Sequence, residues 1–287
     1  MKDHSNLVGK VVDEQDTELT FKDTILYALS LGFSSNPKDD KQLKFTYEEN
    51  LQSLPGLSMV LAYPGFWIAE PEYGFDWKKV LHAEEFFEIH NPIPPEGKLF
   101  GRTTVESVVD RGAEKGCFIY SKKELFLSDR KTLLATVVSN TLARGDGGFS
   151  TGAANQKSGN TPARIPDREP DLVCDLDTLP QSALFYRLCG DLNPLHADPK
   201  VAETAGFEAP ILHGRCTMGV AMRALIKSYC DYEASKLKSM QVRFSAPFMP
   251  GETLRTEMWK ENNQIFFNSI ALERNIRVLS NGLATLN

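Results

Sequence analysis

The stretch ALFYRLCGDLNP, residues 183–194, decides the fold because a degraded copy of it occurs earlier in the chain as ILYALSLGFSSNP, residues 25–37. Both stretches carry a Tyr, a Gly and an Asn-Pro pair in the same order. Thr20-x-x-Asp23 precedes the first stretch and Thr178-x-x-Gln181 the second, and this spacing is typical of a helix N-cap box. The likeness predicts two copies of one structural unit.

A second pair of matching segments lies further along the chain. HNPIPPEGKL, residues 90–99, and SAPFMPGETL, residues 245–254, each join Pro and Gly in a turn that leads into a strand-like run. The matched prolines are 55 residues apart in the first copy (Pro37 and Pro92) and 53 in the second (Pro194 and Pro247). This agreement in spacing supports an internal duplication.

The segment between the two copies, residues 144–171, is rich in Gly, Ala, Ser, Asn and Pro, which predicts an extended connector. We therefore divide the chain into an N-terminal repeat at 1–143, this connector, and a C-terminal repeat at 172–287. Each repeat ends in runs rich in β-branched and aromatic residues, which favour antiparallel strands. These runs are 117–128, 132–142, 254–261, 264–273 and 277–286.

Residues 216–229 have apolar side chains at helical spacing and are apolar nearly all round in their first half, which predicts a buried helix. At the matching place the first copy has only GFDWKK, residues 74–79, which is short and polar. We expect the central helix of the first repeat to be reduced or lost. Strands together with one buried helix predict an α+β fold.

Composition excludes several classes of protein. The net charge of −6 argues against a nucleic-acid partner, and no apolar run approaches the length of a membrane span. The N-terminal residues are polar and acidic, unlike a secretory signal peptide, and the chain does not end in Ser-Lys-Leu. An odd number of cysteines without a C-x-x-C pair indicates unpaired core thiols in a reducing compartment. They are Cys117, Cys174, Cys189, Cys216 and Cys230.

The segment GDLNPLHADP, residues 190–199, allows two interpretations. As a turn, Asp and Asn hydrogen-bond nearby backbone, and Asp198-Pro199 starts a helix. As a catalytic segment, Asp191 and His196 converge on one water and move a proton near neutral pH. The earlier copy FSSNPKDD, residues 33–40, keeps Asn-Pro but has no nearby His. The turn therefore forms without the pair, which favours a catalytic role for Asp191 and His196.

Gly214 precedes the predicted buried helix, where free backbone N–H groups and the helix dipole favour an anionic oxygen. It is our candidate for an oxyanion hole, and a tight turn is the competing explanation for this Gly. We assign His213 only a packing role. Potential metal ligands are Asp191, His196, Asp198 and His213, but without a closely spaced His pair or a Cys cluster we predict no metal.

The segment YRLCGDLNPLHADPKVAETAGFEAPILHG, residues 186–214, resembles the signature of the MaoC-like (R)-specific enoyl-CoA hydratases, the hydratase 2 family. VRFSAPFMPGETL (242–254) and, in the first half, YALSLG (27–32), LKFTYE (43–48) and VLHAEEF (80–86) resemble the same family, and the likeness covers nearly the whole chain. It implies a double hot-dog fold and hydration of trans-2-enoyl-CoA to (R)-3-hydroxyacyl-CoA in fatty-acid β-oxidation.

The resemblance also implies roles for single residues. Asp191 and His196 would activate the water and Asn193 would position them, while the Gly214 N–H would stabilise the thioester oxyanion. The residues matching the family's substrate contacts are His82, Ala83, Lys115 and Phe244, with Ala83 standing where relatives have Gly. The acyl-CoA substrate brings its own coenzyme A, so no cofactor and no metal are implied.

Alternatives stay open at this point. A hot-dog thioesterase or acyl dehydratase would share the fold and CoA binding, and a non-catalytic acyl-CoA binding module is the alternative outside enzymes. A reduced first helix favours medium or long acyl chains. The family implies a peroxisomal location, with a cytoplasmic one as the alternative. The chain could act alone, as a homodimer or as one unit of a multifunctional β-oxidation enzyme.

Overall fold

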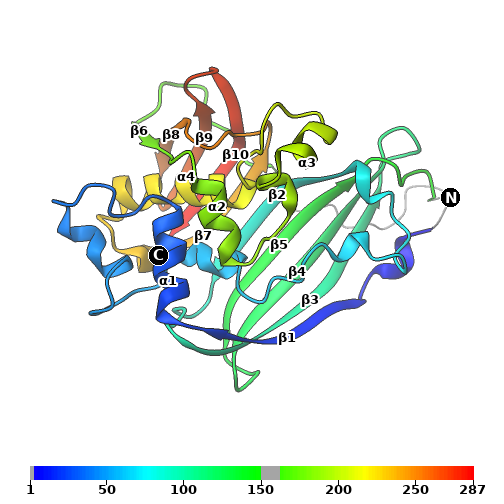
Figure 1. The fold of residues 1–287 in the computed structure, drawn as a ribbon, viewed down its shortest axis with the longest axis horizontal. Helices are drawn as coiled ribbons and strands as arrows, with labels where there is room; N and C mark the ends of the chain where they lie inside the picture. The colour runs from blue at the N-terminus through cyan, green and yellow to red at the C-terminus, as the bar shows by residue number, and fades with distance from the viewer. Residues whose placement is uncertain (1–2, 150–161) are drawn as a thin grey trace.

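The computed structural model describes residues 3–149 and 162–287. Its strands form one ten-stranded antiparallel sheet in the order β1-β3-β4-β5-β2-β7-β10-β9-β8-β6 (Figure 1). The strands are β1 Val11–Leu19, β2 Val80–Ile89, β3 Gly97–Asp110, β4 Cys117–Leu127, β5 Leu133–Ala143, β6 Leu172–Asp177, β7 Leu237–Phe244, β8 Thr253–Glu261, β9 Gln264–Ala271 and β10 Ile276–Leu286. The predicted strands in both repeats are therefore confirmed.

Four α-helices and several 3-10 helices connect the strands of this sheet among the described residues. The α-helices are α1 Phe21–Ser30, α2 Ser182–Tyr186, α3 Pro199–Thr204 and α4 Gly214–Tyr229. The 3-10 helices are η1 Ser5–Leu7, η2 Asp40–Phe45, η3 Pro55–Met59, η4 Trp67–Ala69, η5 Trp77–Lys79, η6 Arg187–Cys189, η7 Pro194–His196 and η8 Ala234–Lys236. Together with the sheet they confirm the α+β class.

The strand order shows the duplication directly. From its outer edge to the middle, the first half of the sheet runs β1-β3-β4-β5-β2, and the second half runs β6-β8-β9-β10-β7. These orders are equivalent, since each half begins with the strand that precedes α1 or α2 and ends with the next strand in sequence. β2 and β7 pair antiparallel with Phe87 opposite Met240, so the two repeats share one continuous sheet.

The buried helix α4 lies across the second half of the sheet (Figure 1) and contacts β6, β7 and β8, which confirms the helix predicted at 216–229. Gly219 of α4 packs against Leu31, the residue that follows α1, because a Cβ there would lie 2.5 Å from Cδ2 of Leu31. A larger residue at 219 would force the Leu31 side chain to shift.

The first half has no α-helix between α1 and β2, which confirms that its central helix is reduced. The buried element at this place is η3, which contacts β2, β5 and α4. Lys123 of β4 stabilises the end of η3 by donating from Nζ to the carbonyls of Met59 (3.2 Å) and Leu61 (2.5 Å). The segment 74–79, named from the sequence, instead leads into β2 through η5.

One of the two predicted N-cap boxes is wrong. Thr20 and Asp23 form the box at α1 as expected. At the second place α2 begins at Ser182 without a side-chain cap, and Thr178 instead donates from Oγ1 to the carbonyl of Glu252 (2.8 Å). Tertiary contact between the end of β6 and the turn before β8 has replaced local capping.

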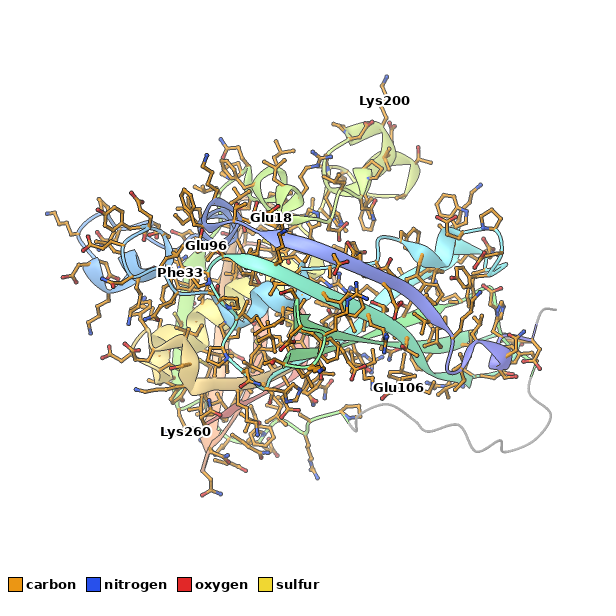
Figure 2. The ribbon with its side chains drawn as sticks, turned by 90° about the horizontal axis from the view of Figure 1, so that it is seen from below. Glu18, Phe33, Glu96, Glu106, Lys200 and Lys260 are labelled. Atoms are coloured by element: carbon orange, nitrogen blue, oxygen red, sulfur yellow. The ribbon has the colours of Figure 1, made fainter. Side chains whose placement is uncertain are left out.

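The boundaries between the repeats and the connector remain predictions, although β5 ends at Ala143 and β6 begins at Leu172. Much of the predicted connector, 150–161, lies outside the described residues. Four of the five cysteines are buried, as expected for core thiols, and Cys189 is half-buried. No helix within residues 3–149 and 162–287 is long and apolar enough to cross a membrane. Lys200, on α3, projects away from the sheet (Figure 2).

Candidate active site

The loop from Gly190 to His196 is built by its own side chains. Gly190 ends η6 with φ 134°, a conformation that favours glycine. The Asp191 carboxylate accepts from the backbone N–H of Asn193 at 3.2 Å, and Asn193 Oδ1 accepts from the N–H of Leu195 at 3.0 Å. The turn interpretation is therefore confirmed for both side chains. Asp198 caps α3 as expected, accepting from Lys200 N.

His196 is buried and its tautomer follows from one hydrogen bond. Nδ1 lies 2.8 Å from the carbonyl oxygen of Ile211, and because a carbonyl only accepts, Nδ1 carries the proton. Burial lowers the pKa of His196 below its ordinary 6.5, against opposing effects of this hydrogen bond and the charge of Asp191. At neutral pH the ring is neutral and Nε2 holds a lone pair, so His196 can serve as a base.

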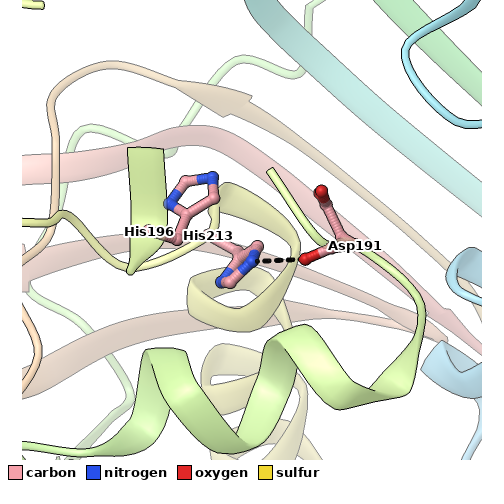
Figure 3. Close-up of side chains that lie close together, drawn as sticks. All are labelled: Asp191, His196 and His213. Atoms are coloured by element: carbon pink, nitrogen blue, oxygen red, sulfur yellow. Dashed lines mark hydrogen bonds between the residues drawn. The ribbon is translucent and has the colours of Figure 1, made fainter. Parts of the chain in front are cut away.

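His213 packs against both members of the predicted pair. Its ring stacks on that of His196 with the centroids 3.7 Å apart, and its Nε2 donates to the backbone carbonyl of Asp191 at 3.1 Å (Figure 3). Burial and the neighbouring His196 lower the pKa of His213. The sequence analysis assigned His213 a packing role only, whereas in the structure His213 contacts both candidate catalytic residues.

Three potential metal ligands meet here. One ligand atom each from Asp191, His196 and His213 lies within 4.8 Å of the others, while Asp198 serves as a helix cap. The two imidazole planes differ by only 28°, so their in-plane lone pairs do not converge on a common ion. We keep the prediction that the site holds no metal.

Gly214 is the first residue of α4, so its N–H has no acceptor within the helix. Phe244, at the end of β7, packs against it, since a Cβ on Gly214 would lie 3.0 Å from Cε1 of Phe244. The ring of His82 from β2 lies 4.7 Å from that of Phe244. The fold thus gathers Gly214, Phe244 and His82 from three separate segments.

The sequence analysis missed three residues around this group. Arg215 is buried, donates from Nε to Glu85 (2.9 Å) and stacks its guanidinium over the ring of Tyr63 (4.6 Å). Burial raises the pKa of Tyr63 to about 12, opposed by Arg215 and assisted by Asp191. Tyr63 and Arg215 therefore lie within electrostatic range of Asp191. The signal available in the sequence was Arg215, a charged residue in a largely apolar stretch. Because a buried charge needs a partner, such a residue predicts an ion pair.

The remaining predicted contacts lie at one end of the sheet. Ala83 follows His82 at a register shift in the pairing of β2 with β5. Lys115 is exposed in the turn between β3 and β4. That turn is at the same end as the start of β2, since Val80 pairs with Ala143 and Ala143 with Cys117. Lys115 is therefore exposed at the end of the sheet where β2 begins, whereas His196 and His213 are buried.

Comparison with known proteins matches both halves of the chain to one family. Residues 18–145 match the model "MFE-2 hydratase 2 N-terminal domain" and residues 160–281 match "MaoC like domain". The chain is 37% identical to peroxisomal multifunctional enzyme type 2 of Mus musculus, over 97% of this chain and 38% of that enzyme. It is 34% identical to the peroxisomal enoyl-CoA hydratase 2 of Arabidopsis thaliana, over 92% of this chain and 90% of that protein.

Solved structures agree with this assignment. A MaoC-like dehydratase from Phytophthora capsici is 31% identical, with a TM-score of 0.87 over 100% of this chain and 99% of that one. A Mycobacterium tuberculosis protein described as a double hot-dog fold aligns with a TM-score of 0.60 and 12% identity. The alignment covers 99% of this chain and 98% of that protein's chain. At that identity the likeness concerns the fold alone, and it confirms the predicted double hot-dog.

Proposed function

The chain belongs to the hydratase 2 family of MaoC-like proteins, and we propose that it hydrates trans-2-enoyl-CoA to (R)-3-hydroxyacyl-CoA. One observation carries the proposal. The buried His196 is fixed with its Nε2 lone pair free, beside the Asp191 carboxylate and the N-terminus of α4. A base, an acid and an oxyanion donor are what the addition of water to an enoyl thioester requires.

In this reaction a water bound between Asp191 and His196 loses a proton to His196 Nε2 as its oxygen bonds to the β-carbon. The double bond gives its electron pair to the α-carbon and the thioester carbonyl. Asp191 and His196 together then return a proton to the α-carbon, so one water is added in total. Asn193 contributes by holding the Asp191 carboxylate through its backbone N–H.

Negative charge develops on the thioester oxygen during this step. The N–H of Gly214, at the positive end of α4, is the proposed donor to that oxygen. Donors aimed at developing charge stabilise the transition state more than the bound substrate, and so they raise the rate. Phe244 beside Gly214 would line the substrate site.

The other predicted contacts concern binding. We assign His82 and Ala83 to the wall of the substrate site and Lys115 to the CoA moiety, whose phosphates attract an exposed lysine. The short η3 in place of a central helix supports medium or long acyl chains. In this scheme the acyl-CoA needs no further cofactor, because the protein supplies both the proton transfer and the oxyanion donor.

Two other functions fit the same fold. A thioesterase would direct its water to the carbonyl carbon, and a binding module would use no base. The deciding experiment follows a medium-chain trans-2-enoyl-CoA by enoyl absorbance, free thiol release and chiral analysis of the product. Loss of absorbance with (R)-3-hydroxyacyl-CoA and no thiol supports hydratase 2. Thiol release, an (S) product, or binding without turnover contradicts it.

Location and assembly are also proposals. Two relatives are named as peroxisomal, which supports a peroxisomal site of action. Because the chain spans 38% of the mouse multifunctional enzyme, we propose that it performs the hydratase step, alone, as a homodimer or within a longer β-oxidation enzyme. We expect no nucleic-acid partner, given the net charge of −6.

A further inference from the structure

Glu85 is a buried charge that the proposed reaction does not use. It lies on the inner face of β2 with Phe87, and it is only 1% exposed. An ionised carboxylate at such a place is costly unless every oxygen is paired. The groups that contact the Glu85 carboxylate therefore indicate what its charge does.

Both carboxylate oxygens have partners. Oε1 accepts from Nε of Arg215 at 2.9 Å, and Oε2 lies 2.7 Å from Nε2 of His82. Burial raises the pKa of Glu85, but Arg215 and His82 outweigh it and lower the pKa to about 2. Glu85 is thus anionic and can only accept, so His82 donates through Nε2 and leaves Nδ1 for another partner.

The backbone of β2 is shaped to make this contact. Along a regular strand, residues three apart point to opposite faces of the sheet. Here the pairing with β5 shifts between His82 and Glu84, so that Ala83 is an extra residue and His82 turns to the face of Glu85. Bulges of this kind re-aim side chains beside active sites.

The same carboxylate joins the two repeats at the candidate site. His82, from the first repeat, lies against Phe244, which in turn packs on Gly214. Arg215, from the second repeat, directly follows Gly214 in the chain. Glu85 therefore holds a side chain next to the substrate site on one oxygen and the start of α4 on the other.

We propose that Glu85 is a positioning residue that orients His82 toward the bound acyl-CoA, with Arg215 holding Glu85 in place. The proposal rests on the proposed function only in naming the substrate. Without this role, the Glu85–Arg215 pair would be an ion pair that serves only the stability of the core. Glu85 acts through His82, so its effect on the substrate must disappear when His82 is absent.

The test is a double-mutant cycle of Glu85→Gln, His82→Ala and the combined variant. We expect Glu85→Gln to raise KM by about tenfold, the size of one lost hydrogen bond, with kcat changed less. In the His82→Ala background the same substitution should leave KM unchanged, because residues acting through one contact are not additive. The dissociation constant for a saturated acyl-CoA should follow the same pattern.

A matched ion pair controls for loss of stability. Glu252 is 8% exposed and pairs with Arg274, and no recorded side-chain contact joins either of them to His82, Phe244 or Gly214 among the described residues. Thermal unfolding should show both Glu252→Gln and Glu85→Gln lowering the melting temperature, since each strands a partner charge. Only Glu85→Gln should change KM. Adding Arg215→Met to Glu85→Gln removes the stranded charge and should recover the melting temperature without recovering KM.

The outcomes separate this inference from the function. Wild-type KM in Glu85→Gln, or an equal rise in KM with and without His82, overturns the positioning role while (R)-specific hydration stands. Recovery of KM together with stability in the Glu85→Gln, Arg215→Met variant also overturns it. If the wild type does not hydrate enoyl-CoA, the proposed function fails, and the saturated acyl-CoA cycle still decides whether Glu85 acts through His82.

Discussion

The imidazole rings of His196 and His213 stack with their centroids 3.7 Å apart and their planes 28° from parallel. Each ring donates one N–H to a backbone carbonyl, His196 to Ile211 and His213 to Asp191. Burial lowers the pKa of both, so both are neutral at pH 7. His213 therefore packs against one face of the His196 ring. Through its hydrogen bond it also holds the backbone of Asp191, the residue proposed to act with His196.

Replacement of His213 by Phe tests this arrangement. Phe keeps a ring against His196 but cannot donate to the carbonyl of Asp191, so the loop loses one anchor. We expect kcat to fall about tenfold, which corresponds to about 1.4 kcal/mol of lost transition-state stabilisation. Steady-state kinetics on an enoyl-CoA substrate would measure the change.

Tyr186 supplies the matched control. Its ring lies 5.0 Å from that of His213, it is fully buried, and no partner of its hydroxyl is recorded in the described part of the chain. Tyr186→Phe should leave kcat near the wild-type value. Equal activity in His213→Phe and Tyr186→Phe would contradict a positioning role for His213.

The lowered pKa of His196 predicts the acid side of the pH profile. The proposed base works only when neutral, so kcat/KM should stay level near pH 7 and fall only below the ordinary histidine value of 6.5. Profiles of initial rate against pH would locate this limb. A limb centred above 6.5 would mean that His196 is not the buried base described above.

Stability should depend on pH in the same direction. In the unfolded chain His196 and His213 each take up a proton near pH 6.5, whereas burial lowers the pKa of both in the folded state, so the unfolded state binds more protons below that pH. The free energy of unfolding should fall by up to about 1.4 kcal/mol per pH unit for each of these two histidines as the pH drops from 6.5 toward its folded-state pKa. Urea titrations at pH 7.5 and 5.5 should show a smaller fall in His213→Phe than in the wild type.

Much of the fold could be predicted from sequence because the duplication left matched segments. Tyr27 and Tyr186 mark equivalent helices, and the predicted antiparallel strands follow in each repeat. The second N-cap box could not be predicted correctly, because Thr178 donates a hydrogen bond to the carbonyl of Glu252, which lies in a turn distant in sequence. Local patterns do not report such tertiary contacts.

From the residue pattern alone, without the family resemblance, the candidate site was predictable only where residues are close in sequence. Asp191 and His196 stand in one loop, and their contrast with the earlier copy identified them. Glu85 and Arg215 are 130 residues apart, and their pairing depends on the junction of β2 with β7. The bulge at Ala83 that aligns His82 with Glu85 has no reliable signal in a single sequence.

Gly214→Ala tests the proposed oxyanion donor. A Cβ would lie 3.0 Å from Phe244, so the ring must shift or the N–H must tilt away from the substrate. We expect kcat to fall by at least about 100-fold, the loss typical of one oxyanion-hole donor, with the fold intact by circular dichroism. Adding Phe244→Leu makes room for the methyl group and should restore part of the activity. Wild-type activity in Gly214→Ala would contradict the assignment.

Lys115→Glu tests the proposed contact with CoA. Lys115 is exposed, so reversing its charge should not disturb the core, and it should raise KM about three- to tenfold through lost attraction for phosphate, with kcat unchanged. The effect should shrink at high salt, because exposed charges are screened. Lys98 is also exposed and lies at the opposite end of β3, so Lys98→Glu is the matched control. Equal KM values for the two variants at low salt would remove Lys115 from the binding site and move the CoA moiety to another part of the surface.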